Sequence, residues 1–114
     1  MRYALMAAGL LAGTVAAHAH AMLEHASPGA GATLAQPPKA VVLEYTEALE
    51  PSFSSVIVND ANGHDVTAGP SSASGSTMRV PLKPLGPGTY RVIWHAVSVD
   101  THRTEGAFSF AVSQ

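Results

Sequence analysis

One long alternation of residue types constrains the fold of this 114-residue chain more than any other feature. The run "YRVIWHAVSV" occupies residues 90–99. Because successive side chains of a β-strand point to opposite sides, the run predicts a strand with two distinct faces. One face carries Tyr90, Val92, Trp94, Ala96 and Ser98, and the other carries Arg91, Ile93, His95, Val97 and Val99.

Similar short runs recur along the chain, separated by turns such as "SPGAGA", "QPPK" and "KPLGPG". They predict strands at residues 22–26, 40–45, 54–59, 65–67, 77–81, 88–97 and 106–112. About seven short strands at this spacing predict an all-β domain, a Greek-key β-sandwich or barrel of the cupredoxin or immunoglobulin kind. Trp94 is expected in its core, and "AGPSSASGS" is expected to form a flexible hairpin loop.

Composition excludes several classes of function. Charged residues make up 12% of the chain and the net charge is −2, so no basic surface is available for nucleic acid or anionic lipid. The chain has no cysteine, which excludes disulfides, thiol chemistry and thiolate metal sites. It also lacks phosphate-loop and Ser-His-Asp signatures.

The N-terminus has the layout of a secretory signal peptide. Arg2 is followed by an apolar run from Tyr3 to Ala17 and then by small residues. The run is shorter than the roughly 20 residues that a spanning helix needs, which argues against a membrane anchor. The chain is therefore expected to divide into a signal peptide, residues 1–19, and an exported domain, residues 20–114, without membrane insertion after cleavage.

Two cleavage positions satisfy the small-residue rule, and either one leaves a histidine first. Cleavage after Ala17 would start the exported chain at His18, and cleavage after Ala19 would start it at His20. A chain starting His-Ala-His could bind Cu(II) or Ni(II) in a square plane through its amine, two amides and the second imidazole. The local spacing does not choose between the two.

A second histidine feature lies beyond the predicted strand 88–97. In "SVDTHRTEG", Asp100 and His102 are separated by one residue, so in an extended segment their side chains point to the same side. A carboxylate and an imidazole that project together are two ligands of a candidate metal site. The pair alone is a weak signal, because most such pairs are surface polar residues.

An N-terminal histidine would complete such a site. Its free amine and its imidazole can chelate one metal ion together, and both lose their protons readily when a metal competes. With His102 they supply three nitrogens, and Asp100 adds an oxygen. A nitrogen-rich site without sulfur suits Cu(II); Zn(II) or Ni(II) would fit but bind less tightly.

Three stretches of the chain match a known family in order. They are "HAMLEHASPGAGATL" from His20, "QPPKAVVLEYTEALEPSFS", and the long, specific "GTYRVIWHAVSVDTHRTEGAFSF". Over nearly the whole exported domain the sequence resembles the CopC-like periplasmic copper-binding proteins. The resemblance implies cleavage after Ala19 and a CopC-like β-domain.

The resemblance also implies a site and a role. His20, Asp100 and His102 would bind one Cu(II) ion per chain, and Glu47 would support the N-terminal amine from outside the ligand set. The implied role is copper sequestration, transport or resistance in the periplasm, without catalysis, and with a membrane copper transporter as a partner. Delivery, storage and buffering of copper are equally compatible with the sequence.

The chain departs from some family members in one respect. It lacks the methionine-rich segment that binds Cu(I), since the corresponding residues 59–78 contain only Met78 and His64 as candidate ligands. No dedicated Cu(I) site is therefore expected, and Met22 and Met78 are predicted to be packing residues. His25, His64 and His95 are predicted to be surface residues.

The alternative function is a histidine-brace copper redox enzyme of the polysaccharide monooxygenase kind. Such an enzyme also uses an N-terminal histidine, but it needs an open coordination position and a surface for its substrate. Asp100 is expected to fill that position here.

Overall fold

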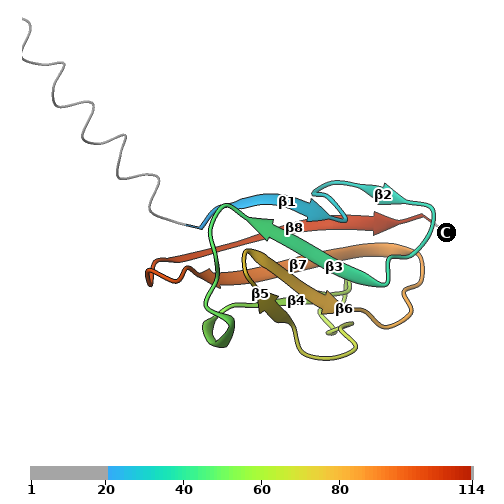
Figure 1. Cartoon of the computed structure of the whole chain (residues 1–114). Coiled ribbons are helices and arrows are strands. Elements are labelled where there is room, and N and C mark those ends of the chain that lie inside the picture. Colours follow the sequence, from blue (N-terminus) through green and yellow to red (C-terminus); the bar gives the residue numbers. More distant parts are fainter. Residues whose placement is uncertain (1–20, 114) are drawn as a thin grey trace, which may run out of the picture.

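The structure is a computed structural model that describes residues 21–113. It confirms the predicted all-β class, with eight strands in two four-stranded sheets that pack face to face (Figure 1). The predicted signal peptide, residues 1–19, and His20 lie outside the described residues. Within the described range, no helix is long and apolar enough to cross a membrane.

The two sheets differ in how their strands are connected. The first sheet has the order β1 (Leu23–Ser27), β3 (Ala40–Tyr45), β6 (Thr77–Pro81), β5 (Ser72–Ser74). The second has the order β2 (Thr33–Leu34), β8 (Arg103–Val112), β7 (Gly88–Val97), β4 (Ser55–Asn59). All pairs of neighbours are antiparallel except β2 and β8, which run parallel. A short 3-10 helix, η3 (Pro51–Phe53), precedes β4.

The core lies between the sheets and follows from the alternation along each strand. In β7 the buried face is the predicted one, with Trp94 only 8% exposed. Facing residues from the other strands complete the core: Val41, Leu43 and Tyr45 of β3, Val56 and Val58 of β4, Met78 and Val80 of β6, and Phe110 and Val112 of β8.

Several predicted elements require correction. Residues 65–67 form no strand, because only isolated bridges from Asp65 to Asn59 and from Thr67 to Leu82 occur there. The segment expected to be a flexible loop contains β5, which pairs with β6, and β2 was also missed. Both missed strands are at most three residues long, too short to show an alternation.

One of the two methionine predictions is also wrong. Met78 is fully buried as expected, but Met22 is 53% exposed. The neighbouring Ala21 is fully buried, so the chain at this point turns Ala21 toward the core and Met22 toward solvent.

The longest pairing joins β7 and β8 through ten residue pairs, from Gly88–Val112 to Val97–Arg103. Within it, Trp94 lies opposite Gly106. A Cβ atom at position 106 would lie 2.7 Å from Cζ2 of the indole ring, so only glycine leaves room for the ring. Tyr45 and the same indole ring form a T-shaped pair, with centroids 5.3 Å apart and planes at 74°.

The substitution Gly106→Ala tests this packing. The added methyl group would force the indole ring out of place, and we expect the free energy of unfolding to fall by about 1–3 kcal/mol. Urea denaturation measures the change. Gly86→Ala is the matched control, because no atom lies within 4 Å of the Cβ position there. Equal unfolding midpoints for the two variants would contradict the predicted clash.

Candidate metal centre

The turn between β7 and β8 carries the predicted carboxylate and imidazole ligands. The N–H of Ser98 donates to the carbonyl of His102 at 2.9 Å, and the N–H of Thr101 donates to the carbonyl of Ser98 at 2.8 Å. Thr101, the last loop residue before His102, has a φ of 72°, in the left-handed region. This is the backbone pattern of a three-residue hairpin loop, and it fixes the path of residues 99–101.

The side chains of Asp100 and His102 lie together as predicted, but they do so in a hairpin loop and not in the predicted extended segment. Nδ1 of His102 lies 3.3 Å from Oδ1 of Asp100, and both side chains are about half exposed, at 44% and 48%. Hydrogen bonds, first from the Ser98 hydroxyl and then from His102, hold the pKa of Asp100 below its ordinary value. An ionised carboxylate beside an imidazole is a donor set that fits a divalent transition metal.

The start of the described chain lies against this turn. The Thr104 hydroxyl donates to the carbonyl of Ala21 at 2.9 Å, across 83 positions of the sequence. Thr104 follows His102 by two residues, and His20 directly precedes Ala21. In Figure 1 the start of β1 and the β7–β8 turn occupy the same end of the sandwich. His20 itself lies outside the described residues.

The segment that contains Glu47 passes between the start of β1 and the β7–β8 turn. The N–H of Met22 donates to the Thr46 hydroxyl, and the N–H of Thr46 donates to the carbonyl of Met22, both at 2.9 Å. Farther along, the N–H of Val99 donates to the carbonyl of Ala48 at 3.1 Å. Glu47 therefore lies on a connection that is bonded on one side to the start of β1 and on the other to the candidate site.

The residues at 21–22, at 46–48 and in the β7–β8 turn form one corner of the sandwich. Three residues that hold this corner together were not predicted from the sequence: Ser98, Thr46 and Thr104. Ser98 is fully buried, and its hydroxyl contacts both Asp100 and the backbone of His102. A usable signal existed, because the alternation places Ser98 as the one polar residue on the core-facing side of its strand. No comparable signal marks Thr46 or Thr104.

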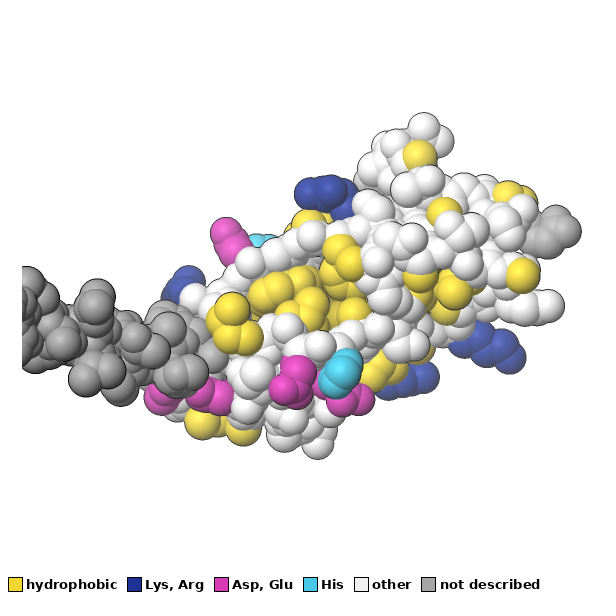
Figure 2. All heavy atoms as spheres, turned by 90° about the horizontal axis from the view of Figure 1, so that it is seen from above, with side chains coloured by type: hydrophobic (Ala, Val, Ile, Leu, Met, Phe, Trp, Pro, Cys, Tyr) yellow, Lys and Arg dark blue, Asp and Glu magenta, His cyan; other side chains and the backbone are white. Residues whose placement is uncertain are grey.

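Acidic residues gather at the same end of the molecule. Six of the eight Asp and Glu residues lie on strands or connections of this half: Glu24, Glu44, Glu47, Glu50, Asp100 and Glu105. Among the Lys and Arg residues in the range 21–113, Arg103 lies at the β7–β8 turn, and Arg79 lies opposite Val42 on the same face of the first sheet as Glu44. Figure 2 shows the visible acidic side chains in the half where β1 begins. This charge favours a cationic ligand at the β7–β8 turn.

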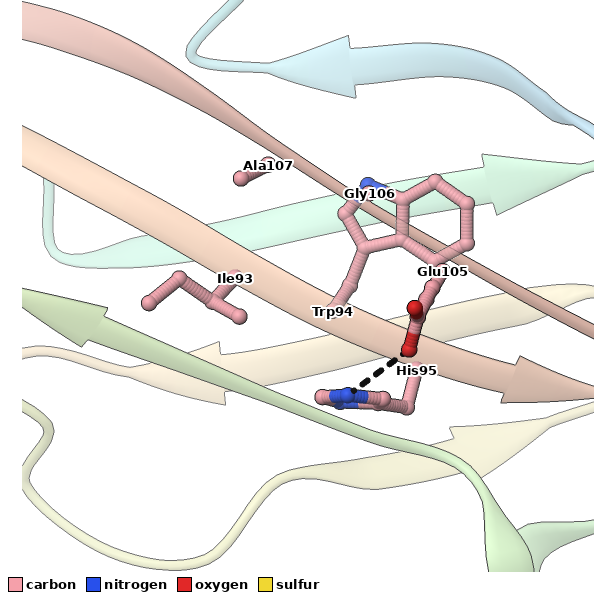
Figure 3. A pocket seen from close by; sticks show the side chains of 6 residues that line it. All are labelled: Ile93, Trp94, His95, Glu105, Gly106 and Ala107. Atoms are coloured by element: carbon pink, nitrogen blue, oxygen red, sulfur yellow. Dashed lines mark ion pairs between the residues drawn. The ribbon is translucent and has the colours of Figure 1, made fainter.

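A separate histidine–carboxylate pair lies on the outer face of the second sheet. Nε2 of His95 is 3.3 Å from Oε1 of Glu105, across β7 and β8, in a hollow also lined by Ile93 and Ala107 (Figure 3). The prediction that His95 is peripheral is confirmed, since its side chain is 58% exposed. His64, 78% exposed, pairs with Asp60 at 3.6 Å in a turn at the opposite end.

Within residues 21–113, no three His, Asp or Glu side chains lie close enough to hold a metal ion. The described chain thus supplies two of the three predicted ligand residues, Asp100 and His102. A metal ion held tightly at this turn needs further donors. The predicted His20 and Glu47 contributions remain predictions.

Tyr45 lies beneath this corner and is 3% exposed. Its hydroxyl is buried and has no hydrogen-bond partner among the described residues. Burial raises the pKa of Tyr45 above its ordinary value, because the ionised form would lose its hydration. The Tyr45 hydroxyl therefore lowers the stability of the fold, although the Tyr45 ring packs well against Trp94.

Two packed four-stranded sheets with a half-exposed carboxylate and imidazole at one end define a small β-sandwich protein with a candidate metal-binding turn. Residues 23–113 match the CopC domain. The chain belongs to the CopC family of copper-binding proteins, which confirms the resemblance noted in its sequence.

Individual relatives agree with this assignment. The chain is 35% identical to Protein YobA of Escherichia coli (strain K12), over 98% of this chain and 94% of that protein. It is 37% identical to Copper resistance protein C of Xanthomonas campestris pv. juglandis, over 95% of this chain and 91% of that protein. The crystal structure of CopC from Methylosinus trichosporium OB3b matches with a TM-score of 0.77 and 30% identity, over 82% of this chain and 94% of that one.

The substitution Tyr45→Phe should stabilise the protein. Removing a buried hydroxyl that has no partner should raise the free energy of unfolding by about 1 kcal/mol at neutral pH. Because folding raises the pKa of Tyr45, the protonated hydroxyl adds a pH-dependent contribution to the free energy of unfolding. This contribution is fully present below about pH 10 and is lost as the pH rises further. Wild type should therefore lose up to about 1.4 kcal/mol per pH unit more than the variant above pH 10.

Urea denaturation between pH 7 and pH 11 measures both effects. Tyr90→Phe is the matched control, because the Tyr90 hydroxyl donates to the carbonyl of Gly86 at 2.7 Å and its loss should destabilise the fold. A Tyr45→Phe variant less stable than wild type would show that this hydroxyl has a partner in solution.

Proposed function

We propose that this protein is an exported Cu(II)-binding protein that sequesters or carries copper in the periplasm. In this proposal residues 1–19 are removed, and the amine and imidazole of His20 bind one Cu(II) ion together with Asp100 and His102. Glu47 supports the amine. The observation that carries the proposal is the hydrogen bond from Thr104 to Ala21, which ties the residue after His20 next to the Asp100–His102 turn.

Several further observations support this assignment. Ala21 is fully buried, so the chain enters the fold in one defined position directly after His20. The acidic half of the molecule attracts a cation. The relative named Copper resistance protein C, 37% identical over 95% of this chain, supports a role in copper resistance. Handover to a membrane copper transporter belongs to the same proposal.

Binding, rather than oxidative catalysis, is the better-supported role. Asp100 lies beside His102 and would occupy the position at which a histidine-brace enzyme leaves copper open. Enzymes that act on polysaccharides commonly present exposed aromatic rings to the substrate. Among the described residues Tyr45, Tyr90, Trp94 and Phe110 are buried, and Phe53 is the exposed large aromatic side chain.

Loss of a proposed ligand provides the direct test. The variants His20→Ala and His102→Ala should each bind Cu(II) at least about 100-fold more weakly, equivalent to about 2.7 kcal/mol, because each removes a nitrogen donor. Competition titration against a chelator of known affinity measures the change, and electron paramagnetic resonance reports the number of nitrogen ligands.

Two controls separate the site from general copper binding. His64→Ala removes an exposed histidine at the opposite end and should leave the affinity unchanged. A chain that begins at Ala19 retains the His20 imidazole but no longer has its free amine, and should bind as weakly as His20→Ala. Wild-type affinity in a correctly processed His102→Ala variant would refute the proposed ligand set.

A further inference from the structure

Ser98 combines complete burial with contacts to both ligand-bearing residues of the turn. It lies on the core-facing side immediately after β7 and is 0% exposed. Its hydroxyl donates to Oδ1 of Asp100 and accepts the N–H of His102 at 3.3 Å. Its own N–H donates to the carbonyl of His102. A single buried residue thus holds the carboxylate of one proposed ligand and the backbone of the other.

The Ser98 hydroxyl contacts both the Asp100 carboxylate, which the His102 imidazole also contacts, and the backbone of His102. Asp100 is half exposed and lies in a loop, so its carboxylate could otherwise rotate toward solvent. A serine hydroxyl has one proton to donate and lone pairs to accept with, which matches the carboxylate on one side and the N–H on the other. The backbone bonds of the turn fix the loop path, whereas the hydroxyl fixes the direction of the Asp100 side chain.

We propose that Ser98 is a positioning residue of the metal site, which orients Asp100 toward the ion and holds it in register with His102. The inference rests on the proposed function, because it takes Asp100 and His102 as ligands. Partners outside the ligand set that orient metal ligands commonly contribute 10- to 100-fold to affinity. The Ser98 hydroxyl is expected to contribute in this range.

Ser54 offers a matched comparison in the same corner. It is 7% exposed, and its hydroxyl accepts the N–H of Val97 at 3.0 Å and lies 3.3 Å from the carbonyl of Val97. Ser54 therefore supports the end of β7 one residue before Ser98, with its hydrogen bonds directed to Val97. Removing either hydroxyl deletes one buried group from the same strand end.

The experiment compares Ser98→Ala and Ser54→Ala in the exported chain that begins at His20. Thermal unfolding of the metal-free proteins, followed by circular dichroism, shows that each variant folds and how much each is destabilised. Chelator competition then gives the Cu(II) affinity. We expect Ser98→Ala to lose about 10- to 100-fold in affinity, with altered copper hyperfine splitting in electron paramagnetic resonance, and Ser54→Ala to bind as wild type does.

A second comparison asks whether Ser98 acts through Asp100. In an Asp100→Ala background, Ser98→Ala should reduce the affinity further by less than about threefold, because the hydroxyl no longer has a side-chain oxygen to orient. Wild-type affinity in folded Ser98→Ala, or an equal loss in Ser54→Ala, would overturn the positioning role. If wild type and His102→Ala bind Cu(II) equally weakly, the proposed function fails instead, so the two failures are distinguishable.

Discussion

The pairing of β7 with β8 is the interaction on which the rest of this structure depends. Its ten residue pairs extend from one end of the sandwich to the other. The inward residues of β7 face the opposite sheet and provide much of the core, including Trp94. Strand β8 also pairs in parallel with β2 at the C-terminal end of β8. Near the start of β8, the Thr104 hydroxyl binds the carbonyl of Ala21. The turn that closes the hairpin carries Asp100 and His102.

This hairpin also explains how distant parts of the sequence meet. The first described residues and the β7–β8 turn are separated by some eighty positions, yet one hydrogen bond from Thr104 joins them. The connection through Thr46 and Ala48 lies between them and is bonded to both. The corner is thus built from three separate segments, which are joined by backbone hydrogen bonds and by the hydroxyl groups of Thr46 and Thr104.

Much of the fold was predictable from the sequence because alternation is a local property. The strands β3, β6 and β7 have the predicted limits, since each is an unbroken run of at least five residues between clear turns. The strands β2 and β5 were not predictable, because two or three residues acquire strand geometry only through the partner beside them. For the candidate site, the proximity of Asp100 and His102 was predicted correctly but from the wrong geometry, because the expected extended segment is a hairpin loop with Thr101 in the left-handed region. The roles of Thr46 and Thr104 depend on contacts between segments far apart in sequence, which no local pattern encodes.

The chain contains a single tryptophan, and it lies in β7, four residues before Ser98. Trp94 packs over Gly106, two residues after the Thr104 that holds Ala21, and against Tyr45, the residue before Thr46. Its indole therefore contacts residues that adjoin two of the three segments that form the corner. Fluorescence from this protein comes chiefly from one buried ring at a known position, so its emission is an intrinsic optical probe of that corner. Quenching by a paramagnetic ion, or a spectral shift on loosening of the corner, could be followed without any attached label.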